Sequence, residues 1–101
     1  MAVLSAEVVQ ERLKSLQGWT LAGGEIVREI SFKDFVMAIA FVNRVAAEAE
    51  AAGHHPDIDI RYNVVRLALV SHDAGGLTQK DFGLATVIEG VIASSMRESS
   101  T

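Results

Sequence analysis

The sequence predicts an α+β fold of two layers, in which a four-stranded antiparallel sheet carries three helices on one face. Stretches with apolar residues three and four apart, typical of helices, alternate along the chain with stretches in which every second residue is apolar, typical of strands. Two connections between strand-like stretches are short enough for tight turns, which favours antiparallel pairing. The predicted order is α-β-β-α-β-β-α, and such elements can bury their apolar faces as a sheet with helices on one side.

The first helix is predicted to begin after Ser5, a favourable N-cap residue, and to run to about Leu16. Gly18 then ends it, because glycine readily takes the left-handed conformation that follows a helix. A hairpin comes next, in which Gly23-Gly24 can supply the positive φ values of a tight turn. The strands of this hairpin are predicted over residues 19–22 and 26–30. The apolar stripe of the helix consists of Val8, Val9, Leu13 and Leu16.

The long central helix is predicted to open at a capping box formed by Ser31 and Asp34, with aspartate in place of the usual glutamate. It ends at Gly53, again through the left-handed conformation that glycine allows. Apolar residues recur through it at three- and four-residue spacing, the pattern of a helix with one buried face. The predicted inward stripe is Phe35, Val36, Ile39, Val42, Val45 or Ala46, and Ala49.

A second hairpin and a last helix complete the predicted fold. Alternation of apolar and charged residues predicts the first strand, and Asn63 turns the chain into the second. These strands are predicted over residues 57–62 and 64–70. Thr78 is expected to cap the last helix, with Asp81 at the third helical position. The tail from Ser94 is polar and is expected to fray. The residues predicted to point inward from this helix are Phe82, Ala85, Ile88 and Ile92.

Length and composition exclude several classes of protein. A chain of 101 residues predicts one domain over residues 1–101. The net charge of −4 and the lack of a basic block argue against direct binding to nucleic acid. The chain has no cysteine, which excludes a disulfide framework, a thiolate nucleophile and a cysteine-ligated zinc. The first residues lack the pattern of a signal peptide and no stretch is long enough to span a membrane, so we expect a cytoplasmic protein.

The apolar content is high for so small a domain, since 50% of the residues are hydrophobic and eight more are glycine. One explanation is that part of the apolar surface is buried between subunits, and we expect a homo-oligomer for this reason. The other explanation is a helical core rich in alanine, which needs no partner chain.

The candidate functional residues form a spaced set around a pair of adjacent histidines. The set contains all three histidines of the chain, its only proline and its only tyrosine. Histidine exchanges protons near neutral pH, so three imidazoles with two carboxylates and a phenol are suited to proton transfer. In chain order the set is Glu50, His54, His55, Pro56, Tyr62, His72 and Asp81.

His54 and His55 follow the glycine that ends the long helix and precede Pro56. A proline pushes the residue before it into an extended conformation, so the two imidazoles should point in different directions and line two walls of a pocket. The alternative is that one of them caps the last carbonyls of the helix, where a cation is favoured.

Glu50 and His72 each have a functional and a structural interpretation. Glu50 lies in the last turn of the long helix, where a carboxylate opposes the helix dipole, and an imidazolium or a ligand would compensate it. It could instead belong to a solvated face with Glu48 and Arg44. His72 follows a strand and precedes a glycine loop, a common place for functional groups. It could instead be an ordinary surface histidine.

Asp81, Tyr62 and Trp19 have good structural explanations of their own. Asp81 can complete the cap of the last helix and still help to fix a pocket. Tyr62 falls on the apolar phase of its predicted strand, which indicates a core aromatic with its hydroxyl near a partner. Trp19 is likewise a core residue first and a wall for a flat ligand second.

Other site types are disfavoured. Ser71-His72-Asp73 is not a catalytic triad, because triad members come from different parts of a fold and no nucleophile elbow is present. Gly75-Gly76 is a turn, since neither dinucleotide-binding nor Walker motifs occur. Three histidines and Glu50 could bind zinc, but the helical motif with two histidines four residues apart is absent, and adjacent imidazoles would diverge.

The complete set Glu-x3-His-His-Pro-x5-Tyr-x9-His-x8-Asp resembles the signature of the pterin-4a-carbinolamine dehydratases. Similar residues extend from about Leu13 to Ile92, nearly the whole chain. One His-His-Pro alone would be weak, whereas the complete spaced set is specific. The further matching segments are Gly18-Trp19, Phe32-Lys33-Asp34-Phe35, Arg44-Val45-Ala46, Tyr62-Asn63, Ser71-His72-Asp73 and Gly76-Leu77-Thr78.

The resemblance implies a lyase that removes water from a 4a-hydroxytetrahydropterin without metal or redox cofactor, in the recycling of tetrahydrobiopterin. It implies that His55 and His72 transfer protons and that His54 binds and polarises the hydroxyl group. Glu50 and Asp81 would orient imidazoles or meet the pterin. Trp19, Pro56 and Tyr62 complete the substrate-binding set that we carry over from the family.

The resemblance also implies a homodimer or homotetramer, and it leaves one alternative function. Animal members act in addition as dimerisation cofactors of a homeodomain transcription factor, and other relatives with degraded signatures act as assembly factors. A non-catalytic binding module is therefore the competing hypothesis. The chain departs from many relatives at Ile58 and Ile60, where they carry tryptophan and asparagine, which affects the expected pocket rim and not the histidines.

Overall fold

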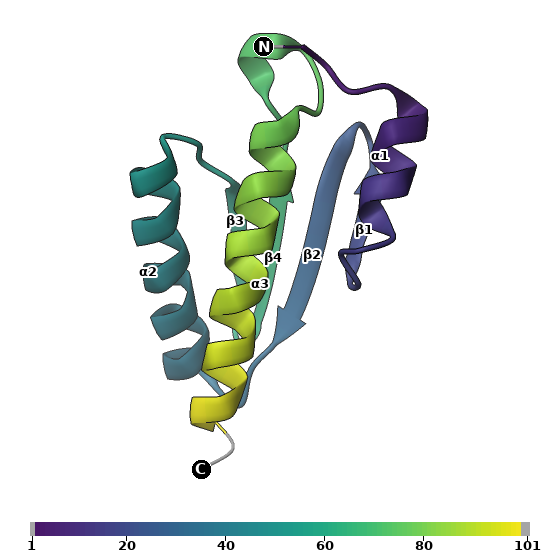
Figure 1. The fold of residues 1–101 in the computed structure, drawn as a ribbon. Helices are drawn as coiled ribbons and strands as arrows, with labels where there is room; N and C mark the ends of the chain where they lie inside the picture. Colours follow the sequence, from purple (N-terminus) through teal and green to yellow (C-terminus); the bar gives the residue numbers. More distant parts are fainter. Residues whose placement is uncertain (1, 100–101) are drawn as a thin grey trace.

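The computed structural model describes residues 2–99, with side chains for residues 2–96, and its element order confirms the predicted α-β-β-α-β-β-α arrangement. The four strands form one antiparallel sheet in the spatial order β1-β2-β4-β3. Figure 1 shows α3 along the middle of the sheet, α2 beside it and α1 next to β1. The elements are α1 (Ala6–Leu13), β1 (Trp19–Ala22), β2 (Glu25–Ser31), α2 (Phe35–Ala52), β3 (Asp57–Arg61), β4 (Val64–Leu69), the short 3-10 helix η1 (His72–Ala74) and α3 (Gln79–Ser99).

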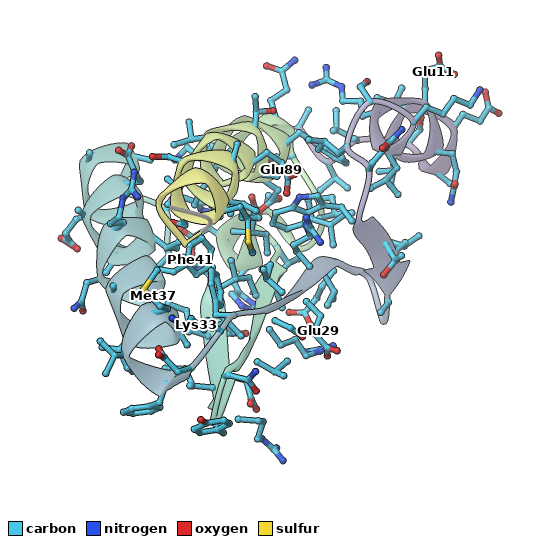
Figure 2. All side chains as sticks on the ribbon, turned by 90° about the horizontal axis from the view of Figure 1, so that it is seen from below. Glu11, Glu29, Lys33, Met37, Phe41 and Glu89 are labelled. Carbon is cyan, nitrogen blue, oxygen red and sulfur yellow. The ribbon has the colours of Figure 1, made fainter. Side chains whose placement is uncertain are left out.

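The strand register separates a core face of the sheet from an open face. Cross-strand partners share a face, and Ile26 pairs with Leu69 while Ile30 pairs with Val65. These side chains are buried beneath the helices. The open face carries the alternate residues, several of them charged, and Glu29 points away from α2 and α3 (Figure 2). None of the described helices is long and apolar enough to cross a membrane.

α1 is shorter than predicted. It begins after the Ser5 cap, whose hydroxyl accepts the N–H of Val8, but it ends at Leu13 and not at Leu16. The backbone N–H groups of the next three residues each bind the carbonyl oxygen three residues earlier, so the chain continues in tight turns. Leu16 is still buried. Of the predicted apolar stripe, Val9 is buried, whereas Val8 is 38% exposed.

α2 ends at Gly53 as predicted, with φ +62°, but its beginning and its buried face differ from the prediction. Asp34 is the N-cap and accepts the N–H of Met37 at 2.9 Å, while Ser31 is the last residue of β2, so the predicted capping box is wrong. Val36 is 72% exposed and Phe35 is also exposed. Alanine and valine lie on all sides of this helix, so the sequence pattern alone is compatible with more than one buried face. The buried residues are Ala38, Phe41, Val45 and Ala49.

The second hairpin turns one residue earlier than predicted. β3 ends at Arg61, which pairs with Val64, so Tyr62 and Asn63 form the turn between them. Tyr62 has φ +54° and is 67% exposed, which contradicts its prediction as a core aromatic. The side chain of Asn63 donates to the carbonyl oxygen of Phe32 at 2.7 Å and thereby fixes the turn to the end of β2.

α3 begins as predicted and continues further. The hydroxyl of Thr78 accepts the N–H of Lys80, and the Asp81 carboxylate at the third helical position accepts the N–H of Thr78, which is the reciprocal cap expected. The helix runs to Ser99, so the fraying predicted from Ser94 is wrong within the described residues. Arg44 of α2 donates to the hydroxyls of Ser94 and Ser95 and ties this end down.

Candidate functional site

A pocket of about 570 Å³ lies at the end of the sheet where α2 ends, η1 follows β4 and α3 begins. That volume is in the range of small-molecule sites. The pocket collects all three histidines of the chain, from segments far apart in sequence. Its lining residues are Gly53, His54, His55, Val70, Ser71, His72, Asp73, Ala74 and Lys80.

His54 is held by a buried carboxylate. Its Nε2 atom lies 2.6 Å from Oδ1 of Asp81, and the Asp81 side chain is fully buried. The other carboxylate oxygen of Asp81 accepts from the Ser71 hydroxyl at 2.8 Å and from the backbone N–H of Thr78 at 2.9 Å. A carboxylate only accepts hydrogen bonds, so we assign the Nε2 proton to His54. This assignment leaves Nδ1 of His54 for a ligand.

The hydroxyls of Ser71 and Thr78 complete this network. Their oxygens are 2.7 Å apart, and the proton of Ser71 is committed to Asp81, so Thr78 donates to Ser71. Both side chains are buried. A donor and an acceptor can therefore be assigned for each hydrogen bond of this network. Together these bonds hold the His54 ring in one orientation.

His55 lies at the exposed rim and points toward α2. Its Nε2 atom is 2.9 Å from Oε2 of Glu50, and the two side chains are 62% and 77% exposed. The two neighbouring imidazoles thus have different partners, which confirms the expected divergence. The backbone N–H of His54 binds the Ala49 carbonyl oxygen at the end of α2, whereas no described bond joins either imidazole to a helix carbonyl.

His72 begins η1, three residues beyond the end of β4, and its side chain is exposed at the pocket. Ser71 before it forms an isolated bridge with Gly76, which closes the small loop that carries the histidine. A ligand atom of His72 lies within 4.8 Å of carboxylate oxygens of both Glu25 and Asp57.

Trp19 and Tyr62 lie away from this pocket. The Trp19 ring is buried, and its N–H donates at 2.7 Å to Glu89, which also accepts from Arg28. Glu89 projects from α3 toward the α1 side of the sheet (Figure 2). His55 precedes the start of β3, whereas Tyr62 follows its end. The length of the strand, roughly 16 Å at about 3.3 Å per residue, therefore separates them. Pro56 stands between His55 and β3 and is partly buried, but it does not line the pocket.

Several pocket residues were missed from the sequence. Ser71 continues the phase of Leu67 and Leu69 on the buried side of β4, and a polar residue in that phase was a usable signal. Lys80, which lines the pocket, carries no such signal, and neither do Glu25 and Asp57 beside His72, because charged residues at the ends of helices and strands are common.

Comparisons with known proteins identify the family of this chain. Residues 2–91 match the family described as pterin 4 alpha carbinolamine dehydratase. The chain belongs to this family. A relative from Acidobacterium capsulatum, provisionally named pterin-4-alpha-carbinolamine dehydratase, is 62% identical over 91% of this chain and 100% of its own length. A relative of the same provisional name from Chloroflexus aurantiacus is 56% identical over 91% of this chain and 99% of its own.

Two solved structures are also similar. The transcriptional coactivator/pterin dehydratase from Brucella melitensis superposes with a TM-score of 0.84 at 32% identity, over 88% of this chain and 97% of that chain. A pterin dehydratase-like protein identified as a RuBisCO assembly factor in the alpha-carboxysome superposes with a TM-score of 0.59 at 19% identity, over 72% of this chain and 84% of that chain. The second likeness concerns the fold alone.

Proposed function

We propose that this protein removes water from a 4a-hydroxytetrahydropterin and releases a quinonoid dihydropterin, by acid–base catalysis with histidines. The observation that carries the proposal is the convergence of all three imidazoles on one pocket of about 570 Å³. The names of the close relatives support the same substrate class. The role in tetrahydrobiopterin recycling follows from this reaction and is part of the proposal.

The reaction needs one proton donated and one removed. The bond between C4a and the hydroxyl oxygen breaks as that oxygen is protonated and leaves as water. The N5 proton is removed and its electron pair forms the double bond from N5 to C4a. Neutral imidazole and imidazolium can serve as base and acid at neutral pH, and each such transfer typically contributes about 10²–10⁴ in rate.

The surroundings of the three histidines support different roles for them. His55 and His72 are exposed and can exchange protons with water between turnovers, so we assign the proton transfers to them. His54 is tied through Nε2 to a buried carboxylate and cannot swing, which suits binding and polarising the 4a-hydroxyl through Nδ1. Asp81 and Glu50 orient these rings, and Pro56 directs the chain from His55 into β3.

A binding module of the coactivator type is the second candidate, because the Brucella melitensis relative is named both coactivator and pterin dehydratase. The complete histidine set favours the dehydratase, since a protein kept for binding alone would have no need of it. We also infer a homo-oligomer, because α2 exposes Phe35 and Val36 at 49% and 72%. Light scattering that finds only monomers would contradict this inference.

The test is the dehydration of freshly generated 4a-hydroxytetrahydropterin, followed by ultraviolet absorbance with and without the protein. We expect faster decay, and we expect the acceleration to vanish in a His55→Ala, His72→Ala double variant. Because both side chains are exposed, that variant should keep the thermal midpoint of the wild type. A folded wild-type protein that gives no acceleration would reject the dehydratase in favour of the binding module.

A further inference from the structure

Two carboxylates that have no part in the proposed proton transfers converge on the imidazole of His72 at the edge of the pocket. One side-chain ligand atom each from Glu25, Asp57 and His72 lies within 4.8 Å of the other two. They come from three separate elements, the start of β2, the start of β3 and the start of η1. Glu25 is partly buried, and the other two are exposed.

The backbone of the sheet brings these residues together. Val27, Ala68 and Asp57 are partners across β2, β4 and β3, so they share the open face. Glu25 precedes Val27 by two residues and therefore emerges on the same face, at the same end of the sheet. His72 follows β4 at that end. The cluster thus depends on strand register as well as on side-chain rotamers.

The three side chains lack other partners. Within the part of the chain that the structure describes, no hydrogen bond or ion pair joins Glu25, Asp57 or His72 through its side chain to another residue. The other two histidines each have a carboxylate partner, at 2.6 and 2.9 Å. Two carboxylates held near each other repel, and a cation between them would relieve that repulsion.

We propose that Glu25, Asp57 and His72 bind a divalent transition-metal ion such as Zn²⁺, and that this ion inhibits the enzyme by occupying the His72 imidazole. Imidazole and carboxylate oxygens are both normal zinc ligands, and three protein ligands leave a position for water. Zinc ligands lie at about 2.0–2.2 Å from the ion and hence roughly 3.4 Å from one another, so a modest rotation of exposed side chains closes the site. The predicted inhibition rests on the proposed dehydratase function, whereas the predicted binding of the metal ion does not depend on it.

The first experiment is calorimetric titration of Zn²⁺ into the full chain after treatment with chelator. We expect one ion per chain, binding weakened by about tenfold or more in Glu25→Gln and in Asp57→Asn, and loss of binding in His72→Gln. Glu29→Gln and Asp59→Asn are matched controls on the same strands and the same face, and they should bind as the wild type does. No binding to the wild type, or equal binding to Glu25→Gln and Asp57→Asn, would overturn the proposed site.

The second experiment measures dehydration with and without Zn²⁺. We expect inhibition of the wild type that chelator reverses, and a Glu25→Gln variant that keeps its basal rate but is inhibited only at Zn²⁺ concentrations about tenfold higher or more. Inhibition that is the same in this variant would place the inhibitory ion elsewhere. If the wild type has no dehydratase activity, the proposed function fails, and the titration still decides the metal site.

Discussion

The inner and outer parts of the pocket both combine histidines with carboxylates, but they differ in burial and in hydrogen bonding. In the inner part, His54 and Asp81 belong to a network in which each buried side-chain polar atom has a partner. In the outer part, His55 and Glu50 form an exposed pair, and His72 has no such close partner among the described residues. Removing one partner of a buried pair leaves the other uncompensated and is strongly destabilising, whereas an exposed pair contributes little to stability. The inner part should therefore control stability, and the outer part should control turnover.

The largest effect on stability is expected at Asp81. Replacing it with alanine removes the acceptor for His54, Ser71 and the Thr78 N–H together, and it leaves buried donors unpaired. Breaking a buried pair of this kind typically costs about 3–5 kcal/mol. We expect a loss of that order in the free energy of unfolding, measured by urea denaturation. Asp73→Ala, an exposed change at the same pocket, is the control, and an equal loss in both variants would contradict the comparison.

The largest effect on turnover is expected at His72. His72→Ala removes one proton-transfer group from the exposed part of the pocket, so the rate of dehydration should fall by at least about tenfold. The free energy of unfolding should change by less than about 0.5 kcal/mol, as for other surface substitutions. A fully active His72→Ala protein would show that the proton-transfer assignment is wrong.

A smaller effect on stability is expected at Ser71. Ser71→Ala keeps Asp81 but removes the hydroxyl between it and Thr78, which leaves the buried hydroxyl proton of Thr78 without its acceptor. Loss of one such bond typically costs about 1–3 kcal/mol. Urea denaturation should therefore place this variant between the wild type and Asp81→Ala. Stability equal to that of the wild type would mean that the hydroxyl is not part of the network that holds His54.

Features of the fold and of the pocket could be predicted where they depend on residues close together in the sequence, and not where they depend on contacts between distant segments. The element order, the glycine that ends α2 and the reciprocal cap of Thr78 and Asp81 are local in sequence, so the pattern of residues predicts them. The position of Tyr62 was missed because alternation does not show where a strand ends, and here the bond from Asn63 to Phe32 decides it.

Only those pocket residues that belong to the regularly spaced histidine set could be predicted from the sequence. The histidine set stands out in the sequence, but the bond between His54 and Asp81 spans 27 residues and depends on how α3 packs near the end of α2. Glu25 is brought near His72 by the strand register of β2 and β4, which no local pattern specifies. The types of residue were therefore predictable, while their partners were not.

Only a small effect on stability is expected at Glu50, and this variant separates the two parts of the pocket most sharply. Glu50→Ala removes the exposed partner of His55, and exposed ion pairs typically contribute only about 0–1 kcal/mol. Thermal stability should hardly change, and dehydration should slow because the His55 ring is no longer oriented. Glu48→Ala, two residues earlier on the exposed surface of α2, is the matched control and should leave both quantities unchanged. If Glu50→Ala instead destabilises the protein as much as Ser71→Ala does, the outer pair carries structure, and the division between a stabilising inner part and a reactive outer part fails.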